Sequence, residues 1–186
     1  MREYSFFLVI DLEATCCDQR SIRRDQTEII EIGAVMVAED TLDVVDEFES
    51  FVRPVRHPQL TAFCTDLTSI TQQQVDGAPL LAEVLANCLE WANRYLGFLF
   101  CSWGDYDRNQ LKHECRINGI PYPFGDEHLN LKQRFTDRQQ LRKRYGMAAA
   151  LNLAGLKLDG THHRGIDDAR NIARLLPFIV GSKKIP

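Results

Sequence analysis

Two acidic side chains at the end of an apolar run are the first residues that could do chemistry. Asp11 and Glu13 follow the apolar residues 6–10 and are one residue apart. A short apolar run is typical of a buried strand, in which residues two apart project from the same face. Like charges side by side repel unless a cation lies between them, and carboxylate oxygens suit Mg²⁺ or Mn²⁺. The pair predicts a divalent-metal site or, as the simpler alternative, a polar strand end that faces water.

A further carboxylate is predicted from the helical pattern near the C-terminus. Residues 166–180 are expected to form a helix, and its apolar face consists of Ala169, Ile172, Ala173, Leu175 and Leu176. Asp168 precedes Ile172 by one turn and therefore faces the core, whereas Asp167 faces solvent. An acid on a core face needs a partner. We expect that partner to be a metal shared with Asp11 and Glu13.

Asp105 and His163 complete the predicted site. Asp105 follows the apolar strand expected at 98–102, so the first and fourth strands both end in carboxylates. His163 lies five residues before the inward Asp168, and a neutral imidazole there can take a proton from water. His162 is expected to be an ordinary loop residue. Four carboxylates can hold two ions about 4 Å apart, which is the arrangement used for in-line attack on phosphodiesters.

The elements that must position these side chains follow from hydrophobic periodicity. Strands are predicted from residue 6 and at 28–38, 44–53, 98–102 and 128–131, and helices at 80–96, 107–117, 132–145, 147–156 and 166–180. The short link 39–43 favours an antiparallel hairpin, and the later helical crossovers favour parallel pairing. Residues 57–79 carry no apolar run. The prediction is an α/β fold with a mixed five-stranded sheet flanked by helices, in one domain over 1–180 with a polar tail at 181–186.

Composition narrows the class of protein. The chain has 186 residues, of which 45% are hydrophobic and 26% charged, as is usual for a soluble globular domain. No apolar run is long enough to span a bilayer, and the first strand begins too early to leave room for a signal peptide. Six cysteines without a C-x-x-C pair or zinc spacing favour a reducing, cytoplasmic location. The net charge of −4 argues against a protein that coats duplexes, but not against a nucleic-acid enzyme.

The combined motifs resemble those of the DEDDh 3′→5′ exonucleases, which share a ribonuclease H-like fold. The matching set is Asp11-x-Glu13, Asp105 and His163 with Asp168. The supporting phrases are VIDLEATC at 9–16, FC and LTSIT within 63–71, SWGDYD at 102–107 and HRGIDDARNIA at 163–173. The resemblance covers nearly the whole chain. It is strongest to the Eri-type branch, which includes histone-mRNA 3′-exonucleases and bacterial KapD-like proteins.

The resemblance implies a role for each matching position. Asp11, Glu13 and Asp168 would hold one metal ion, with Asp11 bridging to a second. Asp105 would act directly or through water, and His163 would be the general base. The implied substrate-binding set comprises the backbone of Ala14 and Thr15 and the side chains of Phe63, Leu67, Trp103 and Tyr106. Gly104 departs from the pattern, because it separates Trp103 from Asp105, which are adjacent in some members.

The implied activity is the Mg²⁺- or Mn²⁺-dependent release of nucleoside 5′-monophosphates from 3′ ends of single-stranded nucleic acid, with RNA favoured and DNA possible. No membrane partner is expected, and the oligomeric state is left open. One alternative is a KapD-like regulatory protein that keeps the fold and acts through a protein partner. Another is a metal-dependent endonuclease, which would need an open groove instead of a pocket for a free 3′ end.

Overall fold

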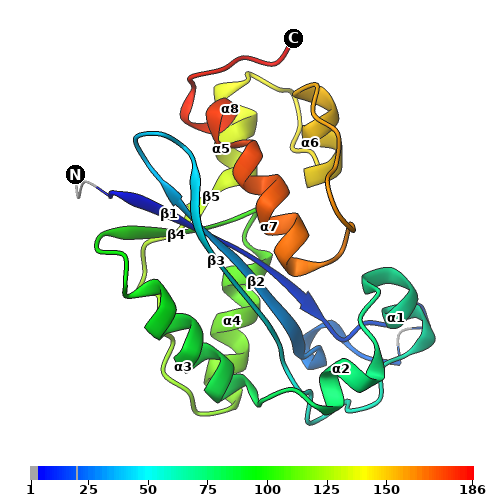
Figure 1. Cartoon of the computed structure of the whole chain (residues 1–186). Helices are drawn as coiled ribbons and strands as arrows, with labels where there is room; N and C mark the ends of the chain where they lie inside the picture. The colour runs from blue at the N-terminus through cyan, green and yellow to red at the C-terminus, as the bar shows by residue number, and fades with distance from the viewer. Residues whose placement is uncertain (1–3, 20) are drawn as a thin grey trace.

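A five-stranded mixed sheet forms the centre of the molecule. The computed structural model describes residues 4–19 and 21–186. The strands are β1 (Phe6–Ala14), β2 (Ile29–Ala38), β3 (Val44–Phe51), β4 (Phe98–Ser102) and β5 (Leu129–Asn130). They lie in the order β3-β2-β1-β4-β5, and β1 to β3 pair antiparallel whereas β4 and β5 join in parallel (Figure 1). The predicted mixed five-stranded sheet is confirmed.

Helices cover both faces of the sheet because the central strand β1 is apolar on both faces. The helices are α1 (Ala62–Thr68), α2 (Gln72–Asp76), α3 (Leu81–Ala92), α4 (Tyr106–Ile117), α5 (Leu131–Arg138), α6 (Met147–Leu153), α7 (Gly165–Arg174) and α8 (Leu176–Val180). Leu8 and Ile10 of β1 pack in a core with α3 and α4, whereas Phe7 and Val9 pack in a second core with α5 to α8. Figure 1 shows these two groups of helices on opposite sides of the sheet. The carboxyl end of β1 therefore emerges between two packed layers.

Several helix boundaries differ from the sequence prediction for local reasons. Residues 57–79 contain α1 and α2, each of which begins at a threonine cap, Thr61 or Thr71, that accepts a backbone hydrogen bond. The helix predicted over 132–145 ends at Arg138. The helix predicted over 166–180 is divided into α7 and α8, and Pro177 lies in the first turn of α8, where its missing N–H costs nothing.

Other expectations concern location and the ends of the chain. Among the described residues, no helix is long and apolar enough to cross a bilayer. No disulfide joins any of the cysteines in the part of the chain that the structure describes. The cytoplasmic location and the domain boundaries at 180 stay predictions. The tail is fixed at several points: the backbone N–H of Ile185 donates to Oε1 of Gln139 at 3.0 Å, and the Gln139 side-chain amide donates to the Lys183 carbonyl at 3.0 Å.

Candidate active site

Three of the predicted acids converge at the carboxyl end of β1. Asp11 and Glu13 come from this strand, and Asp168 comes from the first turn of α7. One carboxylate oxygen from each of the three lies within 4.8 Å of the others. Asp168 is only 4% exposed, so the helical pattern identified the inward acid of the Asp167–Asp168 pair. Chain segments separated by about 150 positions thus bring like charges to one point, as the spacing predicted.

The fourth carboxylate beside this cluster belongs to Asp107. Its Oδ1 accepts the backbone N–H of Leu12, the residue between Asp11 and Glu13, at 3.2 Å. The Asp107 side chain is buried in the first turn of α4, and its charge raises the pKa values of both Asp11 and Glu13. Asp107 therefore joins the site from the opposite side to Asp168.

Asp105 lies outside the cluster, contrary to the sequence expectation. Its side chain is 45% exposed, and its two oxygens contact the guanidinium of Arg108 at 3.0 Å and the amide of Asn130 at 2.8 Å. The physical reason is helical geometry. Asp105 is the residue that precedes α4 and points along the surface, whereas Asp107 is turned toward β1. Gly104, with a φ of +112°, lies in the turn between β4 and α4.

Burial holds the carboxyl groups of this cluster against ionisation, and repulsion from neighbouring acids adds to this effect at Asp11 and Glu13. Burial is the largest cause for Asp11, Glu13, Asp107 and Asp168, whose pKa values are all raised. The pKa of Glu13 rises to about 9 and that of Asp107 to about 7. Such a cluster is unfavourable as four anions in a dry site, and a bound divalent cation would remove the repulsion. The all-oxygen donor set fits Mg²⁺ or Mn²⁺.

Glu31 is a further buried acid beside the site, which the sequence analysis missed. It lies opposite Glu13 in the β1–β2 register and has no exposed surface. Unlike the cluster acids, it pairs with an arginine: it accepts from the Arg164 guanidinium at 3.1 Å, and also from the Gly165 backbone N–H at 2.9 Å. Glu31 thus fixes the first turn of α7, and with it Asp168.

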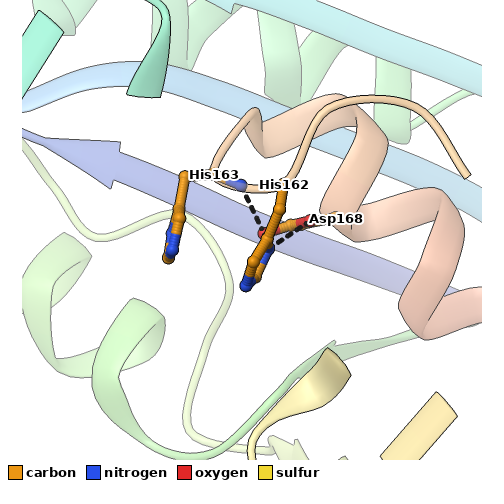
Figure 2. A group of neighbouring side chains, drawn as sticks. All are labelled: His162, His163 and Asp168. Carbon is orange, nitrogen blue, oxygen red and sulfur yellow. Dashed lines mark hydrogen bonds and ion pairs between the residues drawn. The ribbon is translucent and has the colours of Figure 1, made fainter. Parts of the chain in front are cut away.

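The rings of His162 and His163 lie side by side, and His162 reaches Asp168 (Figure 2). Their rings stack with centroids 3.9 Å apart, and His163 has a left-handed φ of +64°. Nδ1 of His163 is 3.9 Å from Oε1 of Glu13, and its backbone N–H donates to Oδ2 of Asp168 at 3.1 Å. Nδ1 of His162 is 2.9 Å from the same Asp168 oxygen. The expectation that His162 is an ordinary loop residue was wrong, because it contacts the buried acid directly.

The His163 ring has the environment that a proton acceptor needs. Its side chain is 40% exposed, so a substrate water can reach it. Burial and the neighbouring His162 lower its pKa below the usual imidazole value. The ring is therefore neutral at physiological pH and can accept a proton.

The predicted aromatic contacts divide into buried and exposed residues. Trp103 is 8% exposed, packs on Phe135 at 5.8 Å between ring centroids, and donates Nε1–H to the Tyr145 carbonyl at 3.1 Å. It belongs to the core, which corrects its placement at the substrate. Tyr106, three residues later, is 38% exposed beside Asp107.

Phe63 and Leu67 lie one turn apart on α1 and are both exposed, at 38% and 37%. Figure 1 shows α1 beside the carboxyl end of β1. Of the two backbone positions, Thr15 already donates its N–H to the Glu28 carbonyl at 2.8 Å, and its side chain is buried. Ala14 ends β1 next to Glu13, and its carbonyl accepts from the Cys64 thiol at 3.8 Å.

Comparisons with known proteins agree with this geometry. A family model described as an exonuclease matches residues 8–176. The human protein named ERI1 exoribonuclease 3 is 34% identical over 183 residues, and the mouse 3′-5′ exoribonuclease 1 is 33% identical over 180. These matches cover 94% and 92% of this chain but 53% and 52% of the relatives. The chain thus spans about half the length of these curated relatives.

Solved structures resemble the whole chain. The nuclease domain of 3′hExo, described as a DEDDh family member bound to rAMP, superposes with a TM-score of 0.88 at 30% identity. That match covers 96% of this chain and 93% of the other. A second structure, of a 3′-exonuclease recognising the 3′ end of a histone mRNA stem-loop, has a TM-score of 0.88 at 29% identity and covers 96% and 64%.

Proposed function

The chain belongs to the exonuclease family, in its DEDDh 3′→5′ branch, and from this premise we propose that it removes nucleotides one at a time from the 3′ ends of single-stranded RNA. The observation that carries the proposal is the meeting of Asp11, Glu13 and Asp168 with a neutral His163 above them. A scaffold protein would gain nothing from buried like charges. RNA is favoured over DNA because the similar proteins are named exoribonucleases and one is bound to rAMP.

We assign the metal ligands from contacts in this chain. Asp11, Glu13 and Asp168 form one group of oxygens, and Asp107 adds a fourth carboxylate on the α4 side. Two divalent cations held there would stabilise the negative charge that develops on the attacked phosphate and on the leaving oxygen. Asp107 takes the role that the sequence analysis gave to Asp105.

The chemistry of the protein's own groups follows from their positions. His163 accepts a proton from the attacking water, whose oxygen forms a bond to the phosphorus of the last phosphodiester. The bond from phosphorus to the 3′ oxygen of the preceding nucleotide breaks in line with this attack. The products are a nucleoside 5′-monophosphate and a strand that is one nucleotide shorter. Phe63 and Leu67 on α1 and Tyr106 on α4 would hold the terminal nucleotide between them, because bases stack on exposed aromatic rings.

The test uses 5′-labelled single-stranded RNA and DNA of one sequence with Mn²⁺ or Mg²⁺. We expect a ladder that shortens by one nucleotide from the 3′ end, faster on RNA, and none when EDTA replaces the metal. Asp11→Asn should abolish the ladder. His163→Gln should lower kcat by about a hundredfold or more, as loss of a general base does.

Other outcomes would favour the alternatives. An internal cut that persists when the 3′ end is blocked would support an endonuclease. A wild-type protein that binds metal but leaves both strands intact would support the regulatory, KapD-like role, and the proposed activity would be wrong.

A further inference from the structure

A pocket lined by polar and charged residues opens beside Tyr106, at the start of α4. It has a volume of about 360 Å³, within the range of small-ligand sites. The lining residues are Arg24, Asp25, Tyr106, Asn109, Gln110 and His113. Four of them lie on one stripe of α4, because positions 106, 109, 110 and 113 are three or four residues apart. The opposite wall is the short helix η1 (Arg24–Gln26).

The Arg24 guanidinium is a positive charge in this pocket that could bind a ligand. Its central carbon lies 5.8 Å from the centroid of the Tyr106 ring. Over 4–19 and 21–186, no carboxylate lies within ion-pair distance of it, because the neighbouring Asp25 is already paired with Arg23 at 2.6 Å. An exposed arginine held beside an aromatic face, without an acidic partner, suits a phosphate next to a stacked base.

The rest of the wall is fixed by hydrogen bonds from polar side chains. The Gln110 amide donates to the Thr27 carbonyl at 3.0 Å, and Nε2 of His113 lies 2.9 Å from the Asp25 carbonyl oxygen. These contacts join α4 to the segment that carries Arg24. The pocket is therefore a built groove that holds a cation, and Tyr106, the neighbour of Asp107, forms part of its wall.

We propose that this groove is a second nucleotide subsite, which binds the nucleotide preceding the 3′-terminal one and contacts its phosphate through Arg24. The inference rests on the proposed function, since it extends the path of the same strand. Tyr106 would separate the two subsites, with the terminal nucleotide on the Asp107 side. Strands of two or more nucleotides would then bind more tightly than a single nucleotide can.

The test compares two substrates. One is a single-stranded RNA of ten nucleotides, and the other is the p-nitrophenyl ester of a nucleoside 5′-monophosphate, which fills only the terminal position. We expect Arg24→Ala to lower kcat/KM for the RNA about tenfold, the loss of one charge-assisted contact, and to leave the ester unchanged. Arg24→Lys should restore part of the loss. Arg94→Ala, which removes an exposed arginine paired with Asp46 on another element, is the matched control and should change neither.

A binding measurement separates this inference from the activity itself. With Ca²⁺ in place of the catalytic metal, the dependence of RNA affinity on salt should have a slope smaller by about 0.7 in Arg24→Ala than in wild type, as for one lost phosphate contact. That result supports the subsite even if wild type cleaves neither substrate, in which case only the proposed function fails. Equal effects on both substrates, an unchanged salt slope, or the same loss in Arg94→Ala would overturn the subsite.

Discussion

The backbone of Gly165 lies directly against the α-carbon of Gly33, at the point where α7 crosses β2. A β-carbon on Gly33 would lie 2.0 Å from the Gly165 carbonyl carbon and 2.1 Å from the Ile166 nitrogen. Gly33 is also the register partner of Asp11 on β1. This close approach lets the first turn of α7 bring Asp168 to the two acids of β1.

Gly33→Ala should therefore displace α7. The obstructing atoms are backbone, which cannot move aside alone, so we expect a loss of at least about 1–3 kcal/mol in the free energy of unfolding, together with a loss of activity. Urea denaturation and the RNA ladder measure the two effects. Gly77→Ala is the control, because its β-carbon would meet nothing closer than 3.6 Å. If the two variants were equally stable, the close approach would not be required.

Asp107→Asn and Asp105→Asn form a matched pair that tests the assignment of the fourth ligand. Both substitutions keep the size of the side chain and remove one charge. Asp107→Asn should lower kcat by at least about a hundredfold, because it removes a buried carboxylate from the cluster. Asp105→Asn should stay within about threefold of wild type, because this acid contacts Arg108 and Asn130 at the surface. If Asp105→Asn lowered kcat more than Asp107→Asn, the fourth metal ligand would be Asp105 and not Asp107.

The sequence predicted the fold because its strong signals are local. The apolar run of β1, the amphipathic α3 and the inward Asp168 each follow from the period of a single element. The choice between Asp105 and Asp107 depends instead on where α4 begins, and a shift of one or two residues changes which acid points inward. The extra Gly104 between Trp103 and Asp105 was the available signal, because it moves the exposed aromatic to Tyr106 and the inward acid to Asp107.

Features that depend on packing between distant segments were not predictable. Glu31 appears in the sequence as one acid within an apolar strand, and only the fold places Arg164 and the Gly165 backbone against it. The helices α1 and α2 are short and are held by threonine caps, so residues 57–79 lack the apolar period that identifies longer helices.

The metal-free protein should lose stability as pH rises. Glu13 has a pKa of about 9 in the folded state against an ordinary value of 4.5, so between these values the folded protein holds a proton that the unfolded chain has released. The free energy of unfolding therefore falls across this range, and Asp107, with a pKa of about 7, adds to the fall. Glu13→Gln should flatten this dependence, and thermal unfolding at pH 5 to 9 measures it.

Addition of Mn²⁺ should restore the stability that the metal-free protein loses at high pH. Mn²⁺ at about a hundred times its Kd would raise the free energy of unfolding by about 2.7 kcal/mol, which corresponds to a rise in Tm of about 5–10 °C. The rise should be larger at pH 8 than at pH 5, because protons compete for the same oxygens. An equal rise in Glu13→Gln would show that the ion binds elsewhere.

Loss of the Tyr106 ring should weaken RNA binding, whereas loss of the Trp103 ring should destabilise the fold. Tyr106→Ala should raise KM for RNA by about fivefold to a hundredfold, the range for loss of one base stack, with little change in stability. Trp103→Ala should instead lower the free energy of unfolding by about 3–5 kcal/mol, because it leaves a cavity beside Phe135. Tyr106→Phe keeps the ring and should behave as wild type. A rise in KM for Trp103→Phe without loss of stability would contradict the assignment of Trp103 to the core.

Arg164, which immediately precedes α7, and Arg170, within α7, make ion pairs that contribute unequally to stability. Arg164 pairs with Glu31, which has no exposed surface, whereas Arg170 pairs at the surface with Glu47, whose side chain is 38% exposed. Arg164→Ala leaves a buried carboxylate with one fewer partner, so we expect a loss of about 3 kcal/mol in the free energy of unfolding. Arg170→Ala should cost less than about 1 kcal/mol. Adding Glu31→Gln to Arg164→Ala should recover part of the loss, because it removes the unpaired charge. Urea unfolding of the three variants measures these changes in the free energy of unfolding. Equal losses for Arg164→Ala and Arg170→Ala would mean that Glu31 does not depend on Arg164 to remain buried beneath α7.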